Sequence, residues 1–568
     1  MDTDYPVHWL IEIIEKIERR NPEAITLATG KTPSGHIHIG ILREIIICDS
    51  LRRVFEMKGN DINFYLFLDS LDAAKRFPDY IDKSFQNKHL GKPFCSIPCP
   101  FENCDCESYA HHFGNELTSS FEDFGIKNKV IWTHELYQSK EMRDNIEIAL
   151  NNTDRIKDIL QKYILPTLDD EKKENFLETQ KKWMPVMAVC ENCNKIQKRA
   201  PDGSIIPNRI KNYDKGNKTV SYTCPVCGYE KIVSIYEGTL KLNWRIDWPA
   251  KWALFKTTCE PAGKDHCVKG GSYDTGLEIC REIYGYQGPI KVPYEWLRLG
   301  ERDMKTSKGI VFTPQQYLKI ADPEIFRMLI MRTNPMKHIS FRVEELPQYH
   351  DYFERMENIY YSLEETESEE EKRFFEFMYP LIKINHVQNR KPKRLSFNLL
   401  IFLSQIQNIL STDKLYEKAK QVMSDKNFEI MIPKDKFKIQ LNRTKNWIDE
   451  IKKILEQEQD PKTKRNLLQK ISIFSIPEEI NGDLKETLSE TQKKGIRSLR
   501  EFILQKNDID ADEIQNKIFT IAKEELEISP KKLFQAIYKL ILGKKYGPRL
   551  GPFLELLDKE WLTKRLNI

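Results

Sequence analysis

The first part of the chain alternates between strand and helix patterns around one glycine-rich loop. A short β-prone run at 24–28 leads into the loop TGKTPSGHIHIG. Residues 41–55 are then apolar at helical spacing, and 62–68 read as a buried strand that ends in Asp69. Strand, glycine loop, helix and strand open a nucleotide-binding α/β unit, whose ligands bind at the carboxyl ends of the strands. The sequence therefore predicts an α/β catalytic domain.

The remaining patterns divide the chain into further regions. Its 568 residues are too many for one core and predict about two to four domains. Cysteine clusters interrupt the α/β pattern, which later returns and gives way to a Lys- and Glu-rich helical pattern. We therefore expect four parts: the first half of the nucleotide-binding domain at 1–91, an insertion with cysteine clusters at 92–233, the second half at 234–338, and an all-α region at 339–568.

Charge and hydropathy limit the class of protein. Lys and Arg number 89 against 85 Asp and Glu, so the formal net charge is only +4. This balance excludes a uniformly basic protein but permits a local basic face for nucleic acid. The chain has no run of about 18 apolar residues, and its N-terminus lacks the order of a signal peptide. We expect a cytoplasmic protein without a membrane span, in which the twelve cysteines are reduced or metal-bound.

The glycine-rich loop has the composition of a phosphate-binding site. Gly35 and Gly40 allow the backbone to approach a ligand closely. The helix after Gly40 presents free N–H groups and a partial positive charge. His36 and His38 are placed to donate hydrogen bonds to triphosphate oxygens as charge builds in a transition state. Taken alone, a glycine- and histidine-containing loop is more often a surface loop with two exposed histidines.

Two cysteine pairs have the spacing of a zinc ribbon. Cys190 and Cys193 form one C-x-x-C pair, and Cys224 and Cys227 form the other. Each pair fits a zinc knuckle, and a tetrahedral four-thiolate site follows if the pairs meet. The alternative is four structural cysteines without metal. A closed four-ligand shell leaves no open position for catalysis, so we expect this zinc to be structural.

A second metal site is suggested by a looser cluster. Cys99, Cys104, Cys106 and His112 lie close together in the sequence, with Cys95 nearby. The spacing is irregular, and it leaves two or three ligand sets open. The cluster therefore predicts a second structural zinc or no metal at all, with equal weight given to the two.

The loop and several later segments resemble one enzyme family. P-S-G-x-x-H-I-G resembles the HIGH signature of class I aminoacyl-tRNA synthetases, with His38, Ile39 and Gly40 as its first three positions; Ile41 stands where a polar residue is usual. TPSGHIHIGILREI, NWRIDWPAKWALF, CEPAGKDHCVKGGSYDTG and KVPYEW are similar to segments of class I lysyl-tRNA synthetases from archaea and some bacteria. RTNPMKHISF and GKKYGPRLGPFL resemble that family's helical anticodon-binding part. The resemblance implies a Rossmann-type class I synthetase catalytic domain with a zinc-containing insertion, followed by an all-α C-terminal domain.

The resemblance also assigns a second phosphate-binding loop. The family's KMSKS loop corresponds loosely to the segment from Asp303 to Gly309, in which Asp303 and Thr306 replace two of the usual lysines. Lys305 and Lys308 remain nearby, and an ammonium on a flexible stem reaches a phosphate from adjacent positions. We expect these two lysines to act on the β- and γ-phosphates.

The family's binding residues transfer to matching positions of this chain. The resemblance implies lysine-binding roles for Gly30, Thr32, Trp244, His266 and Tyr294. The substrate's side-chain ammonium needs a carboxylate or neutral acceptors, and Asp69 or Asp72 is the candidate carboxylate. The nucleotide side is assigned to Pro33, Ser34, Gly35, Asp265, Gly270, Gly271, Asp274 and Ser307. Core packing is the ordinary role of a single tryptophan, so the assignment depends on the whole set.

The implied reaction has two steps. The carboxylate of L-lysine attacks the α-phosphate of ATP, used with Mg²⁺, and the 2′-hydroxyl of the terminal adenosine of tRNA(Lys) then takes the lysyl group. We expect a monomer with tRNA(Lys), L-lysine and ATP as its ligands. One rival is another class I synthetase, such as a glutamyl enzyme. A second rival, suggested by Ile41 and the altered second loop, is an inactive paralogue that binds tRNA or regulates.

Overall fold

The computed structural model describes residues 8–304, 311–392, 394–424, 432–471, 473–479, 486–506 and 509–568. They form two compact units. The first unit contains the chain up to Tyr317, together with Pro323–Arg342 and Met356–Val387; the second contains Leu318–Asp322, Val343–Arg355 and Gln388–Ile568. Within the described ranges, no helix is long and apolar enough to cross a membrane.

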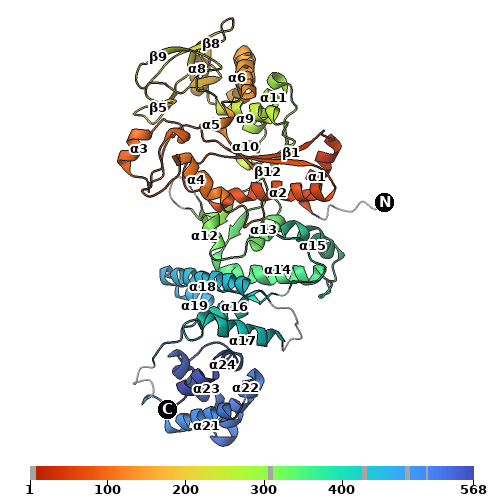
Figure 1. The fold of residues 1–568 in the computed structure, drawn as a ribbon, viewed down its shortest axis with the longest axis vertical. Helices are drawn as coiled ribbons and strands as arrows, with labels where there is room; N and C mark the ends of the chain where they lie inside the picture. The colour runs from red at the N-terminus through yellow and green to blue at the C-terminus, as the bar shows by residue number, and fades with distance from the viewer. Residues whose placement is uncertain are drawn as a thin grey trace. The chain divides into compact units, whose positions relative to one another are not determined.

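A five-stranded parallel sheet forms the centre of the first unit (Figure 1). Its strand order is β12-β11-β1-β2-β3. The strands are β1 (Ile25–Lys31), β2 (Ile62–Leu68), β3 (Lys129–Trp132), β11 (Cys259–Gly263) and β12 (Ile290–Tyr294). The chain first adds strands to one side of β1 and later to the other, so the strand order reverses between β1 and β11. This reversal is the usual ligand-binding position of a doubly wound sheet, and it confirms the expected Rossmann-type fold.

One strand of this sheet lies inside the range that the sequence assigns to an insertion. β3 falls within 92–233, yet it pairs in parallel with β2, with Leu66 opposite Val130 and Phe67 opposite Ile131. The sequence does indicate a strand at 129–133, but only its pairing with β2 shows that it belongs to the central sheet. The small sheets of the cysteine-rich region follow β3 rather than surround it.

Helices cover both faces of the parallel sheet (Figure 1). α2 (Leu42–Met57) packs on β1, β2 and β11, and α1 (Trp9–Arg20) packs on β12. The other described α-helices assigned mainly to this unit are α3 (Lys83–His89), α4 (Tyr109–Thr118), α5 (Thr133–Leu136), α6 (Lys140–Asn151), α7 (Thr153–Ile164), α8 (Asp170–Lys181), α9 (Trp244–Leu254), α10 (Lys264–Cys267), α11 (Ser272–Tyr284), α12 (Pro314–Leu318), α13 (Pro323–Arg332) and α15 (Glu369–Ile382).

Four small sheets complete the first unit. β13 pairs with β14 and β15, and the other three sheets lie between β3 and β11 in the sequence. Their strands are β4 (Val186–Ala188) with β10 (Leu240–Leu242), β5 (Gln197–Arg199) with β6 (Ile205–Pro207), β7 (Ile210–Asp214) with β8 (Thr219–Thr223) and β9 (Glu230–Ser234), and β13 (Leu297–Leu299) with β14 (Arg302–Asp303) and β15 (Ile339–Phe341).

A buried arginine fixes the start of α2, which follows the glycine-rich loop. The Arg43 side chain is 1% exposed. Its guanidinium donates to the backbone carbonyls of Glu295 and Lys337 at 2.7 Å, of Asn334 at 3.1 Å and of Trp296 at 3.5 Å. Carbonyl oxygens satisfy donors that would otherwise be costly to bury. The loop before α2 is therefore held against the residues that follow β12.

The second unit is helical in its described part, as the sequence predicts. The range 339–568 nevertheless begins with β15, which pairs in parallel with β13 of the first unit. In the core of the second unit, Trp447 of α18 is fully buried and donates its indole N–H to the Val343 carbonyl at 2.7 Å. The helices of the C-terminal region are α14 (Leu346–Tyr360), α16 (Phe397–Gln405), α17 (Thr412–Ser424), α18 (Lys434–Gln457), α19 (Pro461–Lys470), α21 (Glu490–Gln505), α22 (Ala511–Thr520), α23 (Pro530–Leu542), α24 (Leu550–Leu556) and α25 (Lys559–Arg565).

Candidate functional site

A cavity of about 700 Å³ opens at the carboxyl ends of the central strands. It lies where the strand order reverses, next to the ends of β1 and β11. All six residues predicted to bind the amino acid line it, namely Gly30, Thr32, Asp69, Trp244, His266 and Tyr294. The size of the cavity suits a small ligand. The structure thus brings this predicted set together from positions far apart in the sequence.

The predicted carboxylates of the cavity are already partnered by buried lysines. Lys251 Nζ lies 2.7 Å from Asp69 and 3.0 Å from Asp247, and Lys241 Nζ lies 3.0 Å from Asp72. Burial by itself lowers the pKa of Lys251, but the charges of Asp247 and Asp69 outweigh it and raise that pKa. Both lysine side chains are 5% exposed. Asp69 and Asp72 therefore belong to an internal ion-pair network before any ligand arrives.

Two other carboxylates in the cavity have no such cation. Burial raises the pKa of Glu44 to about 8, against the lowering effect of a hydrogen bond from the Tyr294 hydroxyl. Burial likewise raises the pKa of Glu260 to about 7. Glu260 accepts from the indole N–H groups of Trp248 at 2.8 Å and Trp252 at 2.6 Å. Among the described residues, neither carboxylate has a Lys, Arg or His nitrogen within 4.0 Å, so both are suited to meet a cationic ligand.

Neither of these two carboxylates is among the residues predicted from the sequence. Glu44 follows the glycine-rich loop on α2, and Glu260 interrupts a short apolar strand. An acidic residue in an otherwise buried element is the signal that points to it, because a buried carboxylate is costly without partners. Only the fold shows that the two face one cavity.

His38 is held in a defined orientation at the start of the loop's helical turn. Its Nδ1 accepts a hydrogen bond from the Gly40 N–H at 3.2 Å. A Cβ at Gly40 would stand 2.8 Å from this nitrogen, so only glycine leaves room for the ring. Burial, together with the charge of Lys31, lowers the pKa of His38 to about 4. The ring is therefore neutral near pH 7 and carries its proton on Nε2, which is available to donate to a phosphate oxygen.

His36 has a different environment. Its Nδ1 lies 2.9 Å from both carboxylate oxygens of Glu116, which is on α4. The Tyr80 hydroxyl accepts from the His36 backbone N–H at 2.8 Å, and the Tyr80 ring lies against the imidazole. These contacts orient the ring and leave its Nε2 for a ligand. The two predicted catalytic histidines therefore have separate supports.

The predicted nucleotide-binding residues within the described ranges lie outside the cavity lining. Pro33, Ser34 and Gly35 continue the loop after Thr32, and the Ser34 carbonyl accepts from the Tyr109 hydroxyl at 3.0 Å. Asp274 pairs with Lys291 at 2.7 Å and accepts from the Gly270 N–H at 2.9 Å. Asp265 is exposed on α10. Asp274 thus already has partners within the protein, whereas Asp265 faces solvent.

Gly270 and Gly271 form the turn before α11. Gly270 has a positive φ of 75°, which favours glycine. A Cβ at Gly271 would stand 2.8 Å from the carbonyl oxygens of His266 and Val268. The His266 ring also meets this turn, because its Nδ1 lies 2.8 Å from the Ser272 hydroxyl. The glycines therefore keep the turn tight beside the cavity residue His266.

The second predicted phosphate-binding loop is only partly described. Lys305, Ser307 and Lys308 lie outside the described residues. The segment just after them contacts the first loop, since the Ile39 N–H donates to the Phe312 carbonyl at 2.8 Å. This bond places Phe312, three residues after the second signature segment, beside the first loop.

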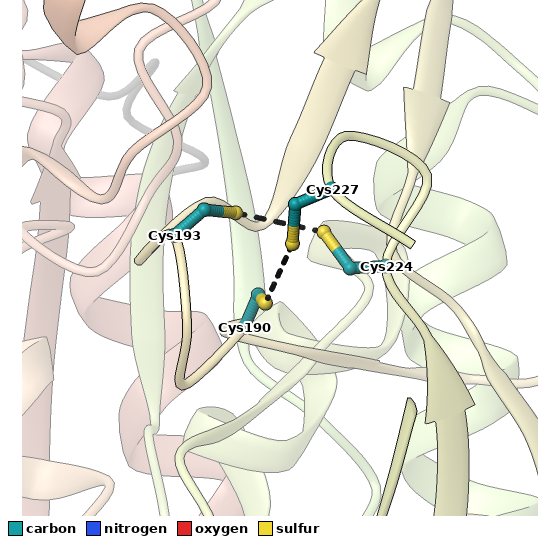
Figure 2. A group of neighbouring side chains, drawn as sticks. All are labelled: Cys190, Cys193, Cys224 and Cys227. Atoms are coloured by element: carbon teal, nitrogen blue, oxygen red, sulfur yellow. Dashed lines mark hydrogen bonds between the residues drawn. The ribbon is translucent and has the colours of Figure 1, made fainter. Parts of the chain in front are cut away.

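The four cysteines of the two C-x-x-C pairs converge (Figure 2). Their Sγ atoms all lie within 4.8 Å of one another, with Cys190 3.6 Å from Cys227 and Cys193 3.6 Å from Cys224. Sulfurs bound to zinc at about 2.3 Å in a tetrahedron stand roughly 3.8 Å apart, so the spacing fits the metal. The four thiolates would hold zinc in a closed structural shell.

The turns that carry these cysteines are alike. In each, the backbone N–H four residues after the first cysteine donates back to its carbonyl, from Asn194 to Cys190 at 2.8 Å and from Gly228 to Cys224 at 2.9 Å. Asn194 and Gly228 both have positive φ, at 57° and 74°. Two equivalent turns facing each other are the arrangement of a zinc ribbon.

Three side chains of the second cysteine cluster lie close enough together to be ligands of one metal ion. His112 Nδ1 lies 3.2 Å from Cys104 Sγ and 3.5 Å from Cys99 Sγ, and these three atoms fall within 4.8 Å of one another. Cys106, which the sequence also assigns here, contacts Cys104 but is not part of this compact set. Three convergent ligands could hold a metal ion.

Comparison with known proteins places this architecture in a family. Residues 7–380 match the family model described as "tRNA synthetases class I (K)", and residues 414–568 match the model described as "Anticodon binding domain". The protein named "Lysine--tRNA ligase" from Methanocaldococcus jannaschii is 34% identical, with 99% of this chain and 100% of that protein covered. The protein of the same name from Methanococcus maripaludis is 32% identical at the same coverage.

The chain also has matches among solved structures. A glutamate tRNA ligase from Elizabethkingia meningosepticum is 13% identical, covers 96% of this chain and 99% of its own, and has a TM-score of 0.42. The family is set by the sequence matches, because one family model spans more than half of the chain and the relatives match it end to end. The chain belongs to the class I tRNA synthetases of the lysine (K) family.

Proposed function

We propose that this protein is a lysine–tRNA ligase that activates L-lysine with ATP and transfers it to tRNA(Lys). The observation that carries the proposal is the cavity at the strand ends, in which Glu44 and Glu260 are buried carboxylates without a basic partner within 4.0 Å in the described chain. L-Lysine has two ammonium groups, and each restores the charge balance of a buried carboxylate. Family membership and the cavity's chemistry point to the same substrate.

The walls of the cavity suit the four-carbon stem of lysine. Trp248 and His266 lie edge to face at 5.6 Å, and Trp244 lies 6.2 Å from His266. Aromatic rings pack against methylene groups and attract a cation at their faces. The two carboxylates Glu44 and Glu260 also discriminate by charge, because they would attract the side chain of lysine and repel that of glutamate. This arrangement disfavours the rival glutamyl enzyme.

The first step requires positioning and charge stabilisation rather than an enzyme nucleophile. The lysine carboxylate attacks the α-phosphorus of ATP, the bond to the β-phosphate breaks, and pyrophosphate leaves. His38 donates its Nε2 proton as a hydrogen bond to a phosphate oxygen, where negative charge increases in the transition state. Mg²⁺ accompanying ATP neutralises phosphate charge. Lys305 and Lys308 are proposed to hold the leaving pyrophosphate.

The second step transfers the lysyl group to tRNA. The 2′-hydroxyl of the terminal adenosine attacks the acyl carbon of lysyl-adenylate, and AMP leaves. The residues that match an anticodon-binding domain, 414–568, are proposed to bind the other end of tRNA(Lys). The convergent cysteines are proposed to hold structural zinc in the region between β3 and β11.

The test is ATP–pyrophosphate exchange with each of the twenty amino acids, in the absence and presence of total tRNA. We expect exchange that depends on lysine. In His38→Ala we expect exchange to fall by about 10²- to 10³-fold, as for other donors to a developing oxyanion. His386→Ala is the matched control, because His386 is an exposed histidine away from the cavity.

Each of the other outcomes would support a different function for the protein. Exchange with a different amino acid would show that the cavity is a pocket for that substrate. Binding of tRNA without exchange under either condition would favour the inactive paralogue that Ile41 suggests. Ile41 is 6% exposed and lines the cavity without capping α2 through its side chain.

A further inference from the structure

Four lysines line the cavity, and Lys31 differs from the exposed Lys75 and from the paired Lys241 and Lys251. Lys31 is the last residue of β1 and lies in the cavity wall between Gly30 and Thr32. Lys241 and Lys251 are both in ion pairs at 2.7–3.0 Å. In the described part of the chain, no carboxylate oxygen comes within 4.0 Å of the Lys31 ammonium, and no hydrogen bond engages it. Lys31 is thus a cation of this cavity that the fold has not already paired.

The unpaired groups of the cavity match the charges of the proposed substrate. L-Lysine carries two ammonium groups and one carboxylate. Near the end of β1, the cavity offers two carboxylates without a cation within 4.0 Å, Glu44 and Glu260, and the ammonium of Lys31. The other lining cations without an ion pair to a described residue are Lys75, which is exposed, and Arg209, which lies over the Trp183 ring. We propose that Lys31 binds the α-carboxylate of the amino acid substrate, while the two glutamates receive its ammonium groups. This inference rests on the proposed function and adds to it the residue that recognises the reacting carboxylate.

The place of Lys31 also suits the reaction. Lys31 ends the strand that leads into the phosphate-binding loop, and its charge acts both on Glu44 within the cavity and on His38 in that loop. The α-carboxylate must occupy that region, because it attacks the α-phosphorus. An ammonium that holds one carboxylate oxygen leaves the other free to attack. It also balances the negative charge of the two reacting groups as they approach.

The electrostatic environment of Lys31 in the free protein favours the binding of an anion. Burial lowers the pKa of Lys31, and Glu44 opposes that effect only from beyond ion-pair distance. A buried ammonium is stable when an anion accompanies it. A simple structural partnership of Lys31 with Glu44 would resemble the close pairs that Lys241 and Lys251 form, and it does not. The substrate carboxylate supplies the missing partner.

The experiment compares two probes that differ only in the carboxylate. Isothermal titration measures the binding of L-lysine and of 1,5-diaminopentane, which keeps both ammonium groups but lacks the carboxylate, to the full-length protein without ATP. The variants are Lys31→Met, which keeps the length of the side chain, and Lys31→Arg, which keeps the charge. Lys129→Met is the matched control, because Lys129 is an exposed lysine on β3 of the same sheet.

We expect Lys31→Met to weaken lysine binding by about 10- to 100-fold, the usual effect of losing a charge-assisted hydrogen bond. Binding of 1,5-diaminopentane should be unchanged or tighter, since a positive charge has been removed from the cavity. Lys31→Arg should keep the preference for lysine over the diamine. Lys129→Met should behave as the wild type with both probes.

Three results would overturn the inference. If Lys31→Met binds both probes more tightly and by the same factor, Lys31 only repels ammonium groups. If it binds both more weakly by the same factor while its thermal unfolding is unchanged, Lys31 only shapes the cavity. If Lys31→Met does not fold, loss of the preference in Lys31→Arg decides against the proposal. Failure of the wild type to bind lysine is a separate result, which rejects the proposed function and this inference together.

Discussion

At the scale of single residues, burial decides how the cavity responds to pH. Burial raises the pKa of Glu44 to about 8 and that of Glu260 to about 7, so both carboxyl groups hold protons over part of the neutral range. The groups that face Glu44 are Tyr294 on β12, Lys31 on β1 and Glu260 on β11. An ammonium ligand binds the ionised form of a carboxyl group. Ligand binding is therefore linked to proton release.

We predict that lysine binding strengthens between about pH 6 and pH 8. Below each raised pKa, the carboxyl group must lose a proton before it can pair with an ammonium, so the association constant rises with pH, by up to about tenfold per unit for each proton released. Above about pH 8 both groups are ionised and the dependence levels off. Isothermal titration in buffers of different ionisation enthalpy measures the affinity and the protons released.

The control for this prediction is Glu44→Gln, which keeps the size of the side chain but removes its titration. This variant should bind lysine more weakly and should lose the part of the pH dependence near pH 8. An affinity that stays constant or falls between pH 6 and pH 8 would contradict the assignment of these carboxylates.

At the scale of elements, one of the two cysteine turns connects neighbouring strands of the small sheet formed by β7, β8 and β9. Cys224 follows β8, and Cys227 precedes β9. Small sheets with little core of their own depend on added cross-links, and a zinc ion supplies one. The strands of this sheet contain many exposed residues, which limits how much hydrophobic burial stabilises them.

We predict that Cys227→Ser removes about one equivalent of zinc per chain and lowers the midpoint of the first thermal unfolding transition. The physical reason is that binding of the metal contributes directly to the folding of the segment that supplies its ligands. Metal analysis of the purified protein and calorimetry measure the two effects. Cys267→Ser is the control, since Cys267 lies outside both clusters and contacts the Ala262 carbonyl. Unchanged zinc content in Cys227→Ser would exclude the four-thiolate site.

At the scale of the whole molecule, the cavity and the residues that match an anticodon-binding domain lie in different compact units. The cavity belongs entirely to the first unit, and residues 414–568 belong to the second. The net charge of +4 is too small to bind RNA strongly through overall charge. Local contacts with phosphates must supply the affinity for tRNA, and such contacts weaken as salt rises.

We predict that salt affects only the step that involves tRNA. Raising the salt from about 50 mM to about 200 mM should raise the KM for tRNA(Lys) in aminoacylation by on the order of tenfold or more, because counterions compete for the phosphates. The KM for lysine should change little, since its contacts are buried and weakly screened. Steady-state kinetics in a salt series measure both constants. An equal salt effect on both would contradict this separation.

Local patterns are sufficient to predict much of the architecture. The glycine-rich loop, the strands at 25–31 and 62–68 and the helix between them follow from periodicity and turn residues, which act over a few neighbouring positions. The C-x-x-C spacing likewise implies its own turns. The resemblance to a family then selects five of the six cavity residues, because the matching segments occur in the same order along the chain. Asp69 is selected for its charge.

The pairing of charges is decided only when the chain folds. From the sequence, Asp69 is as plausible a ligand for an ammonium as Glu44. Only the fold shows that Lys251, 182 residues away, lies beside Asp69. Strand order, the place of β3 in the parallel sheet and the meeting of Ile39 with Phe312 also depend on contacts between distant segments. A carboxylate's role depends on its burial and on the nearest cation, and both are properties of the assembled fold rather than of any stretch of sequence.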